Sequence, residues 1–524
     1  MCPLRRIHDD PTAMPTSRLD PQGFAESFRR RALRMPERPA VSFEGRTTSY
    51  GEMQRQIEQM AAVFVHGGVQ AGDRVAWLGL NHALILVALF ACARIGAIFA
   101  PLNYRLSRTE LADIIRDASI HTLVADAQHA PLIEPALADL PVRRRLLLGA
   151  TQPGWEALDA QLAADLAIPD AIDGKPDDVV VLIYTSGTTG KPKGVMLSNR
   201  NLWTNNLNWL LASDYTSQDV TLNCAPLFHS GGLCVALLPT LLIGGHVVLQ
   251  QGFEAGQFLD ALEHYRVTVS FAVPAMMLFA SQHPRFASTD LSAMRLIVAG
   301  GAPVPEPLLR TYESRNIPVS QCYGMTESST GATFLETGRA TTKLGSCGRP
   351  GLLTEVKLID SDGNTITTPG ERGEICMRGG NITPGYWQRP AETAAAIDAD
   401  GWLHSGDGAY FDDEGFYYIC DRLKDMIISG GENIYPAEIE SLLYEHPAIA
   451  EAAVIGAPDA RWGETVVVIA VLKAGQALDL ETLLAFVAPR LARYKLPKAL
   501  HVIETMPRNP NGKLVKTELR RLYS

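Results

Sequence analysis

Segments typical of strands and of helices alternate through much of the first 400 residues or so of this chain. The strand-like segment 74–78 precedes a helix-like stretch at 83–94, and 267–273 precedes another at 274–280. A further strand-like segment, 296–299, leads into a glycine-containing loop. This alternation predicts α/β layers in which helices pack on largely parallel sheets. Ligand sites in such folds collect at the carboxyl ends of the strands.

The pattern changes in the last third of the chain. Short strand-like segments separated by turn residues predict a β-rich subdomain at about 345–421; they lie at 356–359, 373–380 and 415–420. A smaller mixed unit follows, with helices expected at 436–444 and 480–491 and strands at 453–456 and 466–471. The chain is therefore expected to contain more than one domain, as its 524 residues and 46% hydrophobic content allow.

Charge and cysteine content exclude some classes of function. A net charge of −10 gives no general attraction to nucleic acid, so nucleic-acid binding is disfavoured. The 8 cysteines are scattered without a C-x-x-C pair, and several stand in apolar runs. They predict reduced core thiols in a cytoplasmic protein, with no zinc site.

The sequence shows neither a secretory leader nor a membrane span. Residues 1–20 lack the apolar core of a leader and are expected to be a disordered lead-in. The apolar stretch 83–99 contains Arg94 and ends near Pro101, so it predicts a buried helix. Arginines crowd residues 29–34; a solvated helix face is expected there, and weak peripheral membrane contact stays open as an alternative.

A hydroxyl- and glycine-rich loop is expected at Tyr184–Gly194, directly after the apolar run 179–183. Its glycines let backbone N–H groups approach a polyphosphate, while hydroxyls and lysines add donors and positive charge. It differs from the loop of kinases and GTPases because Lys191 is followed by Pro192, which lacks both an N–H group and a hydroxyl. The segment predicts a site for nucleotide phosphates outside that class.

Together with this loop, several strings resemble the adenylate-forming superfamily, and within it bacterial acyl-CoA synthetases. The strings are Tyr323-Gly324-Met325-Thr326-Glu327, Ser405-Gly406-Asp407, Asp421-Arg422-Leu423-Lys424-Asp425 and Asn509-Pro510-Asn511-Gly512-Lys513. They stand in the family's order and cover nearly the full length. The resemblance implies an α/β fold with a large N-terminal domain of layered subdomains, a small β-barrel-like subdomain and a small, mobile α+β C-terminal domain.

The resemblance also implies domain boundaries and a reaction. The adenylation domain would span 21–421, the hinge 422–425 and the C-terminal domain 426–524. A carboxylate would attack the α-phosphorus of ATP, releasing pyrophosphate, and the thiol of coenzyme A would then displace AMP from the acyl adenylate. The implied ligands are ATP, Mg²⁺, coenzyme A and a carboxylic acid; a homodimer stays open.

Site residues follow from the matching motif positions. Glu327 would be the magnesium ligand, a role that suits one carboxylate beside substrate phosphates, and Thr326 would donate to a phosphate. Asp407 would accept hydrogen bonds from the ribose hydroxyls, with Arg422 near the ribose or phosphate. The other nucleotide-binding positions implied are Thr185, Ser186, Gly187, Thr188, Thr189, Gly190, Lys193, Gly301, Ala302, Pro303, Tyr323, Gly324 and Met325.

The remaining implied roles concern the two half-reactions. Lys513 would stabilise the charge that grows between carboxylate and α-phosphate. Lys424 would lie at the hinge about which the C-terminal domain rotates, bringing Gly430 and Gly431 toward coenzyme A. His229 would stand between the acyl pocket and the path of the thiol, although a core histidine is the alternative.

The acid itself is poorly specified, because acyl pockets select by volume with generic apolar walls. Glycines at 231–232, 300–301 and 324 suggest a roomy channel, and no arginine stands beside His229 to bind a second carboxylate. A medium- or long-chain fatty acid is expected first and an aryl or cinnamate-type acid (feruloyl- or coumaroyl-like) second. Less favoured alternatives are an acyl-AMP ligase serving a carrier protein, a luciferase-like oxygenase and a non-catalytic scaffold.

Overall fold

The computed structural model describes residues 23–186, 192–422, 425–429, 432–459, 461–509 and 514–523. Its first large sheet is assembled from strands of the N-terminal third: β3 (Arg74–Leu78), β4 (Ile98–Leu102), β5 (Thr122–Asp126), β6 (Arg144–Leu148), β7 (Glu156–Ala157), β8 (Val179–Ser186) and β9 (Pro192–Ser198). The strand order is β7-β6-β5-β3-β4-β8-β9, and every pairing is parallel except β8 with β9. Helices α1 (Phe24–Arg34), α2 (Tyr50–His66), α3 (Ala83–Arg94), α4 (Arg108–Asp117), α5 (Ala130–Ile133) and α6 (Leu158–Leu162) belong to this part.

The second large sheet has the order β16-β15-β14-β13-β12-β10-β11-β1-β2, with parallel pairing from β14 through to β1. Its strands are β1 (Pro39–Phe43), β2 (Arg46–Ser49), β10 (Val220–Asn223), β11 (His246–Leu249), β12 (Val269–Ala272), β13 (Leu296–Ala299), β14 (Val319–Tyr323), β15 (Thr333–Phe334) and β16 (Arg349–Pro350). The associated helices are α7 (Asn199–Ala212), α8 (Ser230–Cys234), α9 (Leu237–Ile243), α10 (Ala255–His264), α11 (Pro274–Gln282) and α12 (Glu306–Glu313). One hydrophobic core contains buried residues of both large sheets, so they form one body.

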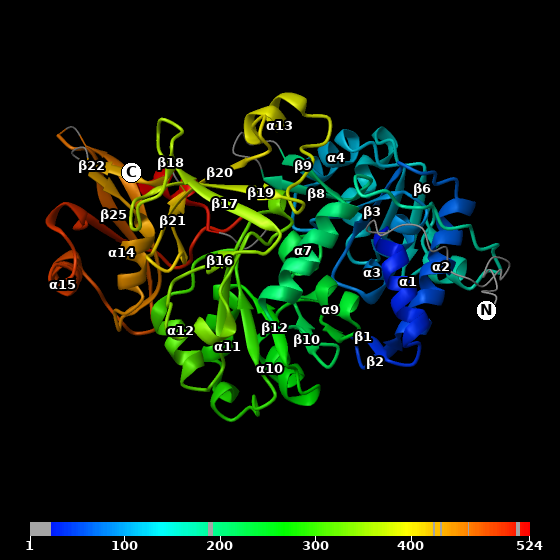
Figure 1. Cartoon of the computed structure of the whole chain (residues 1–524), viewed down its shortest axis with the longest axis horizontal. Helices are drawn as coiled ribbons and strands as arrows, with labels where there is room; N and C mark the ends of the chain where they lie inside the picture. Colours follow the sequence, from blue (N-terminus) through cyan, green and yellow to red (C-terminus); the bar gives the residue numbers. More distant parts are fainter. Residues whose placement is uncertain are drawn as a thin grey trace, which may run out of the picture.

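The expected β-rich part is a five-stranded antiparallel sheet, order β18-β17-β19-β20-β21. Its elements are β17 (Thr354–Ile359), β18 (Thr365–Ile366), β19 (Gly373–Gly379), α13 (Pro390–Ala396), β20 (Leu403–Phe411) and β21 (Tyr417–Arg422). Figure 1 shows this sheet along the top of the molecule, beside the two large sheets. The predicted change from parallel α/β layers to a β-rich part is confirmed.

The C-terminal part forms a separate mixed sheet, at the left of Figure 1, in which β22, β23, β24, β25 and β26 take part. The bounds are β22 (Ile427–Ser429), β23 (Glu432–Ile434), α14 (Pro436–Leu443), β24 (Ile449–Asp459), β25 (Gly463–Leu472), α15 (Leu480–Val487), β26 (Ala499–Val502) and α16 (Lys516–Tyr523). The helix expected to reach residue 491 ends at Val487. Pro489 explains the early end: Ala488 still has helical backbone angles, but proline has no N–H group to continue the helical hydrogen bonds.

The long apolar stretch is a core helix, as predicted. Ile85 to Cys92 of α3 are buried, and Phe90 stacks on Phe24 of α1 with ring centroids 4.8 Å apart. Across the described ranges no helix has the length and apolarity needed to cross a membrane. In α1, Glu26 forms ion pairs with Arg29 and Arg30, so part of the positive charge of this surface is neutralised within the helix. Membrane contact by α1 stays a prediction.

Candidate active site

The predicted phosphate loop is largely a β-hairpin. Thr185 lies opposite Lys193 and Tyr184 opposite Gly194 in the antiparallel pair β8–β9. The loop is therefore shorter than expected, because tyrosine and threonine favour strands and proline is tolerated at the first residue of one. A side chain at Gly194 would place its Cβ 3.0 Å from the Tyr184 ring, so glycine makes room for that ring. Four of the predicted phosphate contacts lie outside the described residues: Gly187, Thr188, Thr189 and Gly190.

Segment 381–387 ties this hairpin to the turn that carries Glu327. The Trp387 N–H donates to the Gly194 carbonyl at 2.7 Å, and the Thr383 N–H donates to the Glu327 carbonyl at 2.8 Å. These backbone bonds join parts of the chain that are far apart in sequence. The positions of Lys193 and Glu327 are thus fixed relative to each other by segment 381–387.

Glu327 is a buried carboxylate and not a surface residue. It lies in the 3-10 turn η3 (Thr326–Ser328) and is only 7% exposed. The Tyr386 hydroxyl donates to its Oε1 at 2.9 Å, and the Lys193 ammonium lies 5.1 Å from the centre of the Tyr386 ring. Burial, reinforced by the negative charge of Glu327, raises the pKa of Tyr386, so the phenol remains a donor. Sequence reasoning missed Tyr386, because the carboxylate it donates to lies 59 positions earlier in the chain.

A second hydrogen-bonded pair of a tyrosine and a carboxylate lies at the predicted ribose end. The Tyr323 hydroxyl donates to Asp407 Oδ2 at 2.7 Å. Asp407 lies within β20, where its backbone pairs with that of Arg422 in β21. Burial, and next the charge of Asp407, raises the pKa of Tyr323 well above its usual value. The structure therefore brings Tyr323, Asp407 and the backbone of Arg422 together at one end of the antiparallel sheet.

The predicted acyl end lies at the carboxyl ends of β12, β13 and β14. The Ser230 and Thr326 hydroxyls are 3.0 Å apart, which joins this end to the Glu327 turn. His229 is half-buried, and its ring tilts against Phe228 with centroids 4.6 Å apart. Gly301, at φ +84°, and the exposed Ala302 and Pro303 follow β13 directly.

The glycines of this end do two different jobs. Added Cβ atoms would come within 3.3 Å of the Phe271 ring at Gly231 and within 2.8 Å of Cys322 Sγ at Gly300, so these glycines border side chains. A Cβ at Gly324 would stand 2.2 Å from the Thr330 carbonyl oxygen, where backbone already fills the space. A Cβ at Gly232 would likewise lie 2.3 Å from the Pro226 carbonyl oxygen. The expectation that all these glycines widen a channel is therefore wrong for Gly232 and Gly324.

Of the moving part, the structure describes the segments beside the predicted residues and not those residues themselves. Lys513, Lys424, Gly430 and Gly431 lie outside the described residues. The flanks of the Lys513 segment pair with each other: Arg508 and Leu514 form an antiparallel bridge, and the Val515 N–H donates to the Pro507 carbonyl at 3.0 Å. The roles proposed for these residues remain predictions.

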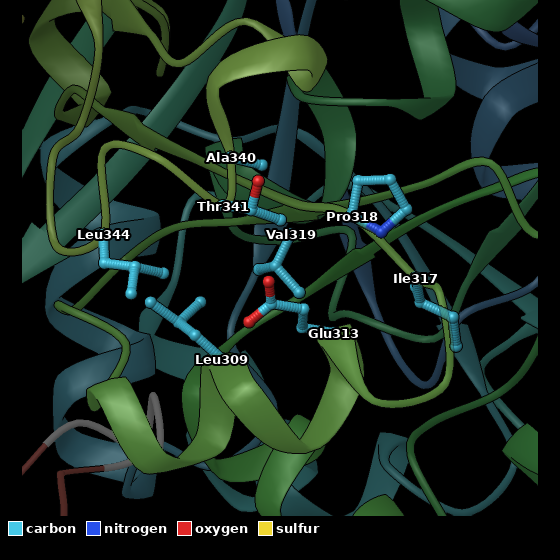
Figure 2. Close-up of a pocket in the computed structure, with 8 residues that line it drawn as sticks. All are labelled: Leu309, Glu313, Ile317, Pro318, Val319, Ala340, Thr341 and Leu344. Carbon is cyan, nitrogen blue, oxygen red and sulfur yellow. The ribbon is translucent and has the colours of Figure 1, made fainter.

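A small pocket lies beside α12 and β14, away from the residues described above. Leu309 and Glu313 of α12 and Val319 of β14 line it, together with Leu344 (Figure 2). Its volume of about 10 Å³ is at the limit for one water molecule. It is too small for an acid or a nucleotide.

The chain matches two protein families over most of its length. The AMP-binding enzyme family matches residues 28–387, and the AMP-binding enzyme C-terminal domain matches residues 438–513. A feruloyl-CoA synthase of Amycolatopsis sp. is 43% identical over 502 residues, covering 96% of this chain and 99% of that protein. An indoleacetate–CoA ligase of Aromatoleum aromaticum is 39% identical, covering 96% of this chain and 98% of that protein. A solved Mycobacterium tuberculosis fatty acyl CoA synthetase superposes with a TM-score of 0.76 at 35% identity, covering 96% of this chain and 98% of that one.

Proposed function

This chain belongs to the AMP-binding enzyme family and is an AMP-forming acid–CoA ligase that uses ATP and coenzyme A; we propose that its acid is an aromatic carboxylate of the cinnamate or arylacetate type. This proposal rests on the 43% identity to a feruloyl-CoA synthase, which extends over nearly the full length of both chains. It reverses the order expected from sequence, which placed a fatty acid first. A fatty acid stays the second candidate, since a fatty acyl CoA synthetase is also similar over nearly the whole chain.

Aromatic side chains near His229 support an aryl acid. Phe228 packs between His229 and Tyr104, and its ring meets Tyr104 edge-on with centroids 5.3 Å apart. The Phe271 ring lies against Gly231, two residues after His229. A planar acid that contacts such rings would gain about 0.5–1.5 kcal/mol beyond simple burial. An alkyl chain would gain only the free energy of burying its apolar surface, so these aromatic rings favour an aryl acid.

The charged and polar groups of the site suit the adenylation half-reaction. We propose that an oxygen of the acid attacks the α-phosphorus of ATP while the bond to pyrophosphate breaks. Both reactants are anions, so cations and donors must be in place where charge develops. Lys193 would face the departing phosphates, and Lys513 the bond being formed. Tyr323 would hold Asp407 for the ribose hydroxyls.

Glu327 fits the Mg²⁺ that the family implies, because it offers a hard carboxylate oxygen and Tyr386 donates to its Oε1. When bound, the ion would neutralise phosphate charge. In the second half-reaction the sulfur of coenzyme A would attack the acyl carbon and AMP would leave. The thiol proton can pass to solvent, so His229 need only border the path.

The test is AMP release from a panel of acids, with and without coenzyme A. The panel contains acetate, decanoate, palmitate, benzoate, ferulate and indoleacetate. We expect the highest kcat/KM with ferulate or indoleacetate, and full turnover only with coenzyme A. A clear preference for decanoate or palmitate would overturn the aryl proposal. ADP in place of AMP would overturn the reaction itself.

A further inference from the structure

A cluster of metal-binding side chains lies on the antiparallel sheet, outside the site described above. Glu374 and Cys376 stand two residues apart on β19, so their side chains share one face of the strand. His404 on β20 is the cross-strand partner of Cys376. A carboxylate oxygen, the thiol sulfur and an imidazole nitrogen of these residues all lie within 4.8 Å of one another.

The two separations that involve His404 match those around a tetrahedral ion. His404 Nδ1 lies 3.7 Å from Cys376 Sγ and 3.5 Å from Glu374 Oε2. Bonds of about 2.3 Å to sulfur and about 2.1 Å to nitrogen or oxygen place such donors about 3.4–3.6 Å apart in a tetrahedral zinc site. The other Glu374 oxygen accepts from the Gly406 N–H at 2.7 Å, which holds the carboxylate in this position. Little movement would bring the donors around one ion.

A second carboxylate lies behind the histidine. Asp398 Oδ2 is 3.5 Å from His404 Nε2, and two backbone N–H groups, of Asp400 and Trp402, hold Asp398. Metal-binding histidines usually give their remaining ring N–H to such a carboxylate, which fixes the tautomer and the ring orientation. This arrangement directs Nδ1 of His404 toward Cys376 and Glu374.

We propose that Glu374, Cys376 and His404 form a binding site for a divalent cation of the zinc class, with Asp398 orienting His404 and water completing the coordination. Binding would replace the Cys376 S–H proton by a sulfur–metal bond, and the proton would pass to solvent. The absence of a C-x-x-C pair led us to expect no zinc site. These ligands come from neighbouring strands 28 residues apart in sequence, so their spacing gave no such signal.

The competing account is a hydrogen-bonded network without an ion. Lys357 of β17 is the other cross-strand partner of Cys376, and its ammonium lies 4.3 Å from the centre of the Trp402 ring. Its positive charge could balance Glu374 in place of a metal. The two accounts differ in whether the Cys376 sulfur bonds an added ion.

Co²⁺ and Zn²⁺ binding to the full-length, tag-free protein separates these accounts. The wild type should bind one Co²⁺ with thiolate-to-cobalt charge-transfer absorption, and Zn²⁺ should displace it. C376S should abolish that absorption. E374Q should weaken Co²⁺ binding at least tenfold but keep the charge-transfer absorption, because the Cys376 sulfur is still present. D398N should weaken binding about 10- to 100-fold as an orienting residue. H264Q, at an exposed histidine, should leave binding unchanged.

Circular dichroism of each variant checks that it is folded. Absence of the charge-transfer band in the wild type, or its persistence in folded C376S, would overturn the proposal in favour of the metal-free network. Neither ATP nor acid is present, so the result is independent of the proposed substrate.

Discussion

At the proposed phosphate end of the site, Lys193, Tyr386 and Glu327 come from distant parts of the chain and are held by polar contacts. At the proposed acyl end, Phe271 lies against Gly231, and Cys322 lies against Gly300. The first end depends on charged and hydroxyl groups in fixed positions. The second depends on the shape left by apolar rings and missing side chains. Variants at the first end should therefore affect all acids alike, and variants at the second should change which acid is used.

The largest effect is expected for Lys513, which we place at the bond that forms between the carboxylate of the acid and the α-phosphate of ATP. K513A should lower adenylation about 10³-fold, because it removes one charged group that stabilises the transition state. Pyrophosphate release measures this half-reaction. Thioester formation from supplied acyl adenylate should stay near the wild-type rate. Equal losses in both half-reactions would contradict the assigned role.

E327Q comes next, with adenylation expected to fall about 10²-fold because a charged ligand to Mg²⁺ becomes neutral. The loss should be the same with ferulate and decanoate. Raising Mg²⁺ should recover part of the rate in pyrophosphate-release assays. E371Q, at an exposed glutamate, is the matched control and should behave as wild type. A loss confined to one acid would show that Glu327 acts at the acyl end instead.

F271L tests the acyl end. It removes the aromatic ring and keeps an apolar side chain, so kcat/KM for ferulate should fall about tenfold, as expected from the loss of one ring contact. Decanoate should change less. F258L alters a buried phenylalanine of α10, outside the proposed pocket, and should lower stability without changing the preference between acids. Equal losses for both acids in F271L would remove Phe271 from the specificity argument.

The smallest effect is expected for Y386F, which removes one hydrogen bond to Glu327 and keeps the ring beside Lys193. Losing a bond worth about 1 kcal/mol should lower kcat/KM for ATP about fivefold. The raised pKa of Tyr386 keeps the phenol protonated through pH 10, because burial and Glu327 oppose its ionisation. The alkaline limb of the pH–rate profile should therefore be identical in wild type and Y386F. A limb that disappears in Y386F would mean that Tyr386 titrates in the assay range.

Sequence reasoning reached the fold and the family because both leave local signals. The strand at 74–78, the helix at 83–94 and the strand at 296–299 all have their expected bounds. Motif strings identified Glu327 and Asp407 as candidates, and in the structure each carboxylate accepts a hydrogen bond from a tyrosine hydroxyl. Their roles stay predictions.

The parts of the site that the sequence did not predict depend on contacts between residues far apart in the chain. Tyr386 acts on a carboxylate 59 positions earlier, and no local pattern predicts that bond. Phe271 stands in an apolar strand like many others, so only its place beside Gly231 distinguishes it. We propose that acid preference depends on such packing, and packing of this kind leaves no local signal in the sequence.

The most direct test is a competition between ferulate and decanoate at equal concentration, with both thioesters quantified from one reaction. Wild type and E327Q should give the same product ratio, in favour of feruloyl-CoA, and F271L should lower that ratio about tenfold. Decanoyl-CoA as the main wild-type product, or a shift in E327Q as large as that in F271L, would contradict the division of the site into an acid-independent phosphate end and an acid-selecting acyl end.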